Sequence, residues 1–368
     1  MYLAITGIWH VKLRTKKGQQ EGDIRLPGIL QANGYGEEIS YDTPWVSGLH
    51  DREWQKREEY GYAQEDGVKV PFLSQPPKHF LGKAFYEKEI VIAKETEETW
   101  HLYIELTHWK TTLYVDGERK GSDMSLCAAH IIACGRLSAG VHRIGIEIDN
   151  SMQAPYRPDG HGVADAVGAT WNGMIGEMAL LTEDELSRRE AEKRAYAQAH
   201  PRQIEVREGK FYVDGRAAYF RGTHFGGDYP LSGHPVTQKA WWLEKMRILK
   251  AWGLNFIRCH SYCPPEAAFA AADEEGIYIQ PECGMWNHFE EGIPMLAILR
   301  EETERILRQF GHHPSFVLFS PSNEPSGDWY QVLRRWVAQT KAYDEALGYG
   351  GRRLYTAKTG WFYEVLPE

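Results

Sequence analysis

Apolar and polar residues alternate in short runs over the first 181 residues, and turn residues separate these runs. In Trp100–His108, for example, Leu102, Ile104 and Leu106 fall on one face, as in a half-buried strand. Three further strands are expected at Thr111–Gly117, which ends in the hairpin signal Asp-Gly, at Val141–Asp149 and at Ile175–Leu181. Many short antiparallel strands favour a β-sandwich or jelly roll.

The two ends of this β region carry their own signals. Met1–Trp9 is apolar but has neither a basic start nor a cleavage site, so we expect a first strand rather than a signal peptide. Thr182–Glu185 matches a capping box, and the residues up to His200 are good helix formers with little apolar face. A solvated connecting helix is therefore predicted after the sandwich.

From about residue 206 the pattern changes to alternating strands and helices. A hairpin at Lys210–Gly215 leads in, one helix begins at Thr237 and ends at Gly253, and another follows Pro264 and ends at Gly276. The expected strands are Ala217–Gly222, Leu254–Cys259, Ile277–Glu282, Phe316–Phe319 and Leu354–Ala357. Such repeats predict a parallel sheet, and a (β/α)8 TIM barrel truncated after about five strands is the natural interpretation.

Length and composition agree with this division. The 368 residues suit two domains, and we expect a jelly roll at 1–181, a helical linker at 182–205 and a partial barrel at 206–368. The net charge of −9 disfavours a nucleic-acid partner, and no apolar run reaches the length of a membrane span. Without a leader, the expected location is cytoplasmic.

The five cysteines are Cys127, Cys134, Cys259, Cys263 and Cys283. Their number is odd, and their spacing does not suggest a zinc site. They are expected to be free, buried thiols, and neither a metal nor a cofactor is predicted.

Catalytic residues of a parallel barrel lie at the carboxyl ends of its strands. By that rule the candidates are His224 after the first strand, Arg258 and His260, Glu282 and Trp286, Asn323 and Glu324, and finally Lys358 and Trp361. No Gly-rich phosphate loop accompanies them, which disfavours phosphoryl and hydride transfer. Carboxylates from different strands among aromatic faces suit glycosidic cleavage, although core aromatics and helix-end charges fit the same residues.

The segment Phe310–Glu324 resembles the strand-four signature of glycoside hydrolase family 2, which contains β-galactosidases, β-glucuronidases and β-mannosidases. Arg258–Ser261, Ala272–Ile277 and Gln280–Glu282 match the preceding segments of that family in the same order. Similarity to its jelly-roll sugar-binding domain is seen at Leu26–Gly28, Ala84–Lys88, Tyr114–Gly117, Asp149–Asn150 and Trp171–Gly176. The resemblance covers nearly the whole chain.

The resemblance implies that Glu324 is the general acid/base and that Asn323 holds the sugar 2-hydroxyl. It places Arg258 and His260 in the substrate pocket, although an internal ion pair is an alternative for them. Glu282 would support the active site; it is a metal position in some β-galactosidases, but Gly284 stands where that metal would need His. His224 is a further candidate for sugar binding, with loop capping as the alternative. From the residues alone, Trp286 and Trp361 are candidates to stack on a sugar ring, with core packing as the alternative.

This sequence also departs from the family pattern. Ser322 stands where a small residue such as Gly is common, and the immunoglobulin-like domain between jelly roll and barrel is missing. The family nucleophile, a Glu on the seventh strand, would lie beyond residue 368, and Glu364 does not match its motif.

We therefore expect a retaining β-glycosidase that acts on a terminal galactoside or glucuronide, with little hydrolysis by this chain alone. The alternative is a non-catalytic carbohydrate-binding or assembly protein. Five strands leave an open edge, which predicts association, for example as a homo-oligomer.

Overall fold

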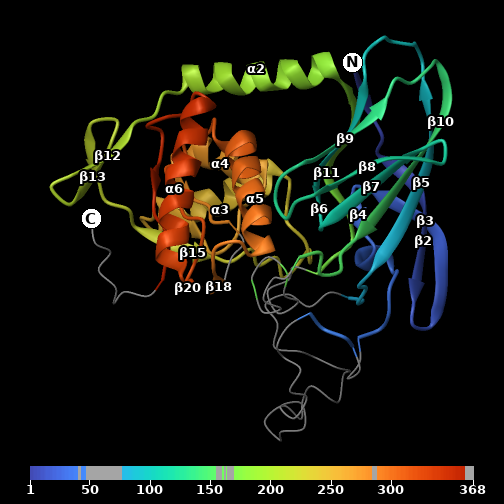
Figure 1. Cartoon of the computed structure of the whole chain (residues 1–368), viewed down its shortest axis with the longest axis horizontal. Helices are drawn as coiled ribbons and strands as arrows, with labels where there is room; N and C mark the ends of the chain where they lie inside the picture. Colours follow the sequence, from blue (N-terminus) through green and yellow to red (C-terminus); the bar gives the residue numbers. More distant parts are fainter. Residues whose placement is uncertain are drawn as a thin grey trace, which may run out of the picture. The chain divides into compact units, whose positions relative to one another are not determined.

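The computed structural model describes residues 1–39, 43–46, 77–154, 160, 163, 170–283 and 288–360 (Figure 1). The chain divides into two compact units. The first contains residues 1–153, 163–192 and 228–237, and the second contains residues 154–162, 193–227 and 238–368. This division differs from the predicted domain limits, because it falls inside a helix and assigns residues 228–237 to the first unit.

The first unit consists of two antiparallel sheets. One has the order β3-β2-β5-β10-β7-β8, and the other has the order β1-β11-β6-β9 with β4 paired to β11. The strands are β1 Tyr2–Ala4, β2 Gly7–Thr15, β3 Gly18–Leu26, β4 Gly28–Ile29, β5 Lys83–Ile92, β6 Trp100–Thr107, β7 Lys110–Val115, β8 Glu118–Met124, β9 His130–Gly135, β10 Gly140–Asp149 and β11 Gly173–Thr182, with a 3-10 turn at Gln31–Asn33. Apolar side chains that alternate along both sheets meet in one core, which includes Val11, Tyr86, Leu102, Ile146 and Met178.

The predicted strands of this unit are confirmed, with one correction at the amino terminus. The turn between β7 and β8 has positive φ at both Asp116 (52°) and Gly117 (85°), as its Asp-Gly sequence predicts. Met1–Trp9 is not one strand: β1 pairs with β11 in one sheet, and β2 pairs with β3 and β5 in the other. The chain changes sheets at Gly7, whose φ of 108° few other residues adopt readily.

Helix α2 spans Glu183–Ala199, as predicted, and Ala197 is its buried residue. The solvated character of this helix is therefore confirmed. Glu98, which lies between β5 and β6, supplies a hydrogen-bond acceptor to the first turn of the helix. The Asp184 amide donates to Glu98 Oε1 at 3.0 Å. The Thr182 hydroxyl, the predicted cap, instead accepts a hydrogen bond from the amino group of Met1.

The second unit begins with an antiparallel group of three strands and continues as an α/β structure. The group contains β12 Ile204–Arg207, β13 Lys210–Val213 and β14 Arg216–Ala218. The parallel strands are β15 Gly222–Phe225, β16 Phe256–Cys259, β17 Tyr278–Gln280, β19 Leu318–Phe319 and β21 Leu354–Tyr355, with a side pair of β18 His288–Phe289 and β20 Ser326–Gly327. Helices α3 Lys239–Ala251, α4 Glu266–Glu275, α5 Pro294–Phe310 and α6 Trp329–Ala346 connect them (Figure 1).

The parallel strands follow one another in sequence order. β15 pairs with β16 and β16 with β17, while β19 pairs with β21. Parallel bridges from Ile279 to Phe316 and from Glu282 to Ser320 join the two groups. The predicted parallel α/β arrangement is thus confirmed for these five strands, and their carboxyl ends share one edge.

Two expectations for this unit are wrong in detail. The first parallel strand is β15 Gly222–Phe225 rather than Ala217–Gly222, because Ala217 and Ala218 pair with β13 in the antiparallel group. His224 therefore lies within the strand, not after it. The helix expected to begin at Thr237 and end at Gly253 is shorter: α3 begins at Lys239 and ends at Ala251, and Trp252, which follows it, is 81% exposed.

Candidate functional site

Arg258 in β16 connects three strand ends of the second unit. Its Nε donates to Glu282 Oε1 at 2.7 Å, after β17. Its Nη2 donates to Asn323 Oδ1 at 2.7 Å, after β19, and to Thr359 Oγ1 at 2.8 Å, after β21. A guanidinium suits this position because its planar fork offers several donors in fixed directions.

Glu282 is the anionic centre of this network and is fully buried, with 0% of its surface exposed. Besides Arg258, its carboxylate accepts hydrogen bonds from the Ser261 amide at 2.8 Å, Gln280 Nε2 at 3.1 Å and Thr359 Oγ1 at 2.9 Å. The buried charge is thus paired and hydrogen-bonded on both oxygens. In this placement Glu282 holds Arg258.

Asn323 is also buried, with 2% of its surface exposed. Its Oδ1 accepts from Arg258 and lies 3.2 Å from Thr359 Oγ1, which orients the amide so that Nδ2 faces away from the guanidinium. Among the described residues, Nδ2 has no hydrogen-bond partner. A buried amide donor without a partner is costly, and a ligand hydroxyl at this point would remove that cost.

Glu324 follows Asn323 in a backbone conformation that few non-glycine residues adopt, with φ of 43°. Such conformations cluster at functional sites because the surrounding structure must enforce them. Here the segment that follows β21 holds the backbone in place: the Glu324 amide donates to the Thr359 carbonyl at 2.9 Å, and the Thr359 amide donates to the Ser322 carbonyl at 3.1 Å. The Glu324 side chain is half-buried.

Gly360 lies directly against the Glu324 side chain. A Cβ at residue 360 would stand 2.5 Å from Glu324 Cγ and 3.0 Å from both Glu324 Oε1 and Asn323 Oδ1. The φ of Gly360 is 70°, which also favours glycine. Sequence reasoning named Lys358 and Trp361 but passed over Thr359 and Gly360 between them. The signal was available, since both follow the fifth parallel strand.

His224 and His260 form a pair at the ends of β15 and β16. His224 Nε2 lies 2.6 Å from His260 Nδ1, and the ring centroids are 4.8 Å apart. One of these two nitrogens must carry the hydrogen and the other must accept it, so each ring fixes the tautomer of the other. His224 is exposed. Its imidazole is therefore accessible to a ligand at this edge of the sheet.

The remaining candidates are placed as follows. Lys358 Nζ lies 4.4 Å from the ring centroid of Trp329. Trp286, Trp361, Gly284 and Glu364 lie outside the described residues. All five cysteines are free and buried, as predicted, and burial raises the pKa of the Cys259 thiol well above its ordinary value.

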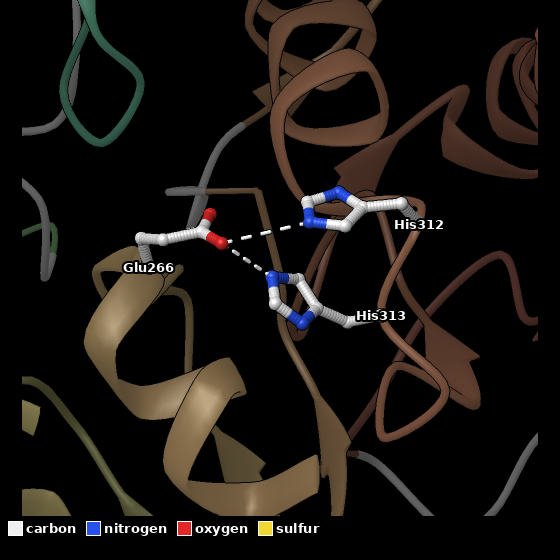
Figure 2. Close-up of side chains that lie close together, drawn as sticks. All are labelled: Glu266, His312 and His313. Carbon is white, nitrogen blue, oxygen red and sulfur yellow. Dashed lines mark hydrogen bonds and ion pairs between the residues drawn. The ribbon is translucent and has the colours of Figure 1, made fainter. Parts of the chain in front are cut away.

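A second group of polar side chains lies elsewhere in the second unit and was not predicted from the sequence. Glu266, at the start of α4, faces His312 and His313, which precede β19 (Figure 2). Burial lowers the pKa of His313, but the carboxylates of Glu266 and Asp273 outweigh this effect and raise it to about 9. The adjacent histidines in Gly311–Pro314 were the available sequence signal.

Part of the second unit is similar in sequence to a known protein family. Residues 204–347 match the family model described as "Glycosyl hydrolases family 2, TIM barrel domain". A β-galactosidase of Yersinia enterocolitica is 23% identical over 144 residues, and one of Yersinia pestis is 22% identical over the same length. Each match covers 37% of this chain and 14% of the Yersinia protein.

Solved structures of similar fold cover more of the chain. A β-glucuronidase from Ruminococcus gnavus, solved with D-glucaro 1,5-lactone, has a TM-score of 0.61 at 14% identity and covers 94% of this chain and 70% of its own. A family 2 β-galacturonidase from Eisenbergiella tayi, solved with glycerol, has a TM-score of 0.62 at 13% identity, with 97% and 71% covered.

These solved structures share the β plus α/β fold of this chain. In sequence, residues 204–347 are similar to the TIM barrel domain of glycoside hydrolase family 2. Among the helices of the described ranges, none combines the length and the apolar character needed to cross a membrane.

Proposed function

We propose that this chain carries the general acid/base, Glu324, of a retaining β-glycosidase that acts on terminal β-linked galactosides or glucuronides. In this proposal the first unit is a jelly-roll sugar-binding domain, and the second unit forms the first five strands of a TIM barrel. The observation that carries the proposal is the network in which Arg258 and Glu282 fix Asn323, directly before Glu324.

Glu324 acts as the general acid and then as the general base. Its carboxyl proton passes to the glycosidic oxygen as the bond between that oxygen and the anomeric carbon breaks. In the second step the carboxylate takes a proton from the water that attacks the same carbon. Its half-buried side chain lies beside Gly360, at the edge of the sheet where the strands end.

In this proposal Asn323 binds the sugar and Arg258 positions Asn323. Nδ2 of Asn323 donates to the sugar 2-hydroxyl, while Arg258 and Thr359 hold its Oδ1. Glu282 is a positioning residue, because its contacts are to Arg258 and to neighbouring donors. The exposed His224, held by His260, contacts the outer hydroxyls of the sugar. No cofactor is part of this mechanism.

The attacking carboxylate is not assigned to a described residue. Retaining enzymes place their two carboxyls about 5–5.5 Å apart, one as acid and one as nucleophile. We propose that the nucleophile comes from a later strand of the complete barrel. The choice between the two sugars stays open, since the relatives matched by sequence are β-galactosidases and one of the structural neighbours is a β-glucuronidase.

The proposal is tested by phenol release from phenyl β-D-galactoside and phenyl β-D-glucuronide in the presence of sodium azide. Azide takes the place of the nucleophile, a role that the proposal assigns to no described residue, and the poor phenol leaving group makes the rate depend on the acid. We expect Glu324→Gln to lower the azide-dependent rate by about 100-fold or more. The control Glu290→Gln removes an exposed carboxylate next to β18 and should leave the rate unchanged. Equal rates for Glu324→Gln and the unchanged chain would exclude Glu324 as the acid.

A further inference from the structure

Three side chains in the second unit bring metal-ligand atoms together away from the proposed active site. Glu266 Oε1 lies 2.6 Å from His313 Nε2 and 3.6 Å from His312 Nε2. All three ligand atoms lie within 4.8 Å of one another. Figure 2 shows the carboxylate facing a nitrogen of each imidazole, so the three donors converge on one point.

We propose that Glu266, His312 and His313 bind a divalent transition-metal ion of the Zn²⁺ type. Two imidazoles and one carboxylate form a donor set that suits Zn²⁺, Co²⁺ or Ni²⁺, whereas Mg²⁺ and Ca²⁺ prefer oxygen ligands. Three protein ligands leave a fourth position for water. This site is independent of the proposed glycosidase function, because none of its residues belongs to the Arg258 network.

The two distances from Glu266 can be compared with those expected around a bound ion. Zinc bonds of about 2.0–2.2 Å place tetrahedral ligand atoms about 3.3 Å apart. The distance of 3.6 Å between Glu266 and His312 already fits, while the 2.6 Å between Glu266 and His313 must widen. Glu266 is free to make that shift, since its side chain is 38% exposed while those of His312 and His313 are 7% and 4% exposed. The ion thus enters from the carboxylate side.

The surroundings of His313 are those of a metal-bound histidine. Its Nδ1 lies 2.6 Å from Asp273 Oδ2, so this nitrogen keeps its hydrogen, while Nε2 faces Glu266 and gives up its own proton to solvent when it binds the ion. Asp273 is itself held by the Ser315 amide at 2.9 Å and the Tyr196 hydroxyl at 3.0 Å. Such a carboxylate behind a histidine orients the ring and strengthens its bond to the metal.

The binding test uses the full, untagged chain after metal removal by chelator. Titration with ZnCl₂ in a calorimeter is expected to give one ion per chain. Glu266→Gln and His312→Asn should each weaken binding by about 100-fold. The matched controls His288→Asn and Glu290→Gln alter an exposed His–Glu pair with 4.0 Å between its atoms and should leave the affinity unchanged.

A second readout identifies the ligands. Co²⁺ in place of Zn²⁺ should give visible absorption bands of a site with nitrogen and oxygen ligands, without the near-ultraviolet band of cobalt bound to thiolate. Far-UV circular dichroism confirms that each variant is folded, and His312→Asn serves alone if Glu266→Gln does not fold. Absence of saturable binding, unchanged affinity in the folded variants, or a thiolate band would overturn the proposal, leaving an ion pair alone.

Discussion

Arg258 Nη2 donates to Asn323 Oδ1 at 2.7 Å and so connects β16 to the residue that precedes Glu324. The two residues are 65 positions apart in the sequence. The hydrogen bond fixes the Asn323 amide, and through the shared backbone it fixes where the Glu324 side chain starts. The geometry of the proposed acid therefore depends on a residue two strands away.

Arg258→Lys should break the hydrogen bond to Asn323 while keeping the positive charge. A lysine ammonium cannot reproduce the fork that reaches Glu282, Asn323 and Thr359 together. The free energy of unfolding, measured with urea, should fall by about 2 kcal/mol. The azide-dependent rate should fall at least about tenfold, because Asn323 loses its orientation. The control Arg335→Lys changes an exposed pair with Glu291 and should alter stability by less than about 0.5 kcal/mol. Equal effects of the two substitutions would contradict the assigned role.

Gly360→Ala should displace the Glu324 side chain. The new methyl group would lie 2.5 Å from Glu324 Cγ, and the positive φ of residue 360 adds backbone strain of about 1 kcal/mol. Gly351→Ala is the matched control: its φ is 76°, but nothing lies within 4 Å of the added Cβ. Both variants should lose similar stability in urea unfolding, whereas only Gly360→Ala should also lose azide-dependent activity. Loss of activity in both would indicate a general effect of strain.

The buried imidazole of His79 should make the stability of the first unit depend on pH. Burial lowers the pKa of this imidazole to about 4, against a smaller opposing effect of Glu37. The folded state therefore binds the proton less readily than the unfolded state, whose ordinary value is 6.5. The contribution of His79 is fully present above pH 6.5 and is lost as the pH falls towards 4, by about 3 kcal/mol in total.

The measurement is urea unfolding at a series of pH values, followed for the unchanged chain and for His79→Gln. Glutamine does not titrate, so the stability of the variant should decline less between pH 6.5 and pH 4. Parallel curves for the two proteins would show that His79 does not carry this dependence.

Local patterns predicted much of the fold. Alternation predicted the core face of Trp100–His108, and Asp116-Gly117 predicted the turn between β7 and β8. Gly276 ends α4 in a left-handed conformation, as its position suggested. These features depend on residues close in the sequence. The first parallel strand was misplaced because Ala217 and Ala218 are equally suited to either strand, and only pairing with β13 decides between them.

Part of the candidate site was also predicted from local patterns, because strand ends can be located in the sequence. The rule of strand ends selected Arg258, Glu282, Asn323 and Glu324, and the structure brings the first three into one network. It did not reveal that Glu282 is buried beneath Arg258, or that Thr359 and Gly360 hold the Asn323–Glu324 segment. Those facts depend on contacts between separate strands, which no local spacing encodes. The Glu266 cluster was missed because its members lie 46 and 47 residues apart.

The anomeric configuration of the product formed with azide tests the proposed division of roles most directly. After reaction of phenyl β-D-galactoside or phenyl β-D-glucuronide with the chain and azide, NMR distinguishes the two glycosyl azides. We predict the α-glycosyl azide, because azide attacks opposite the departing phenol while Glu324 gives its proton to the phenol oxygen. This product should be lost in Glu324→Gln and kept in Glu290→Gln. A β-glycosyl azide would contradict the account, since it would require a covalent intermediate and hence a nucleophile within this chain.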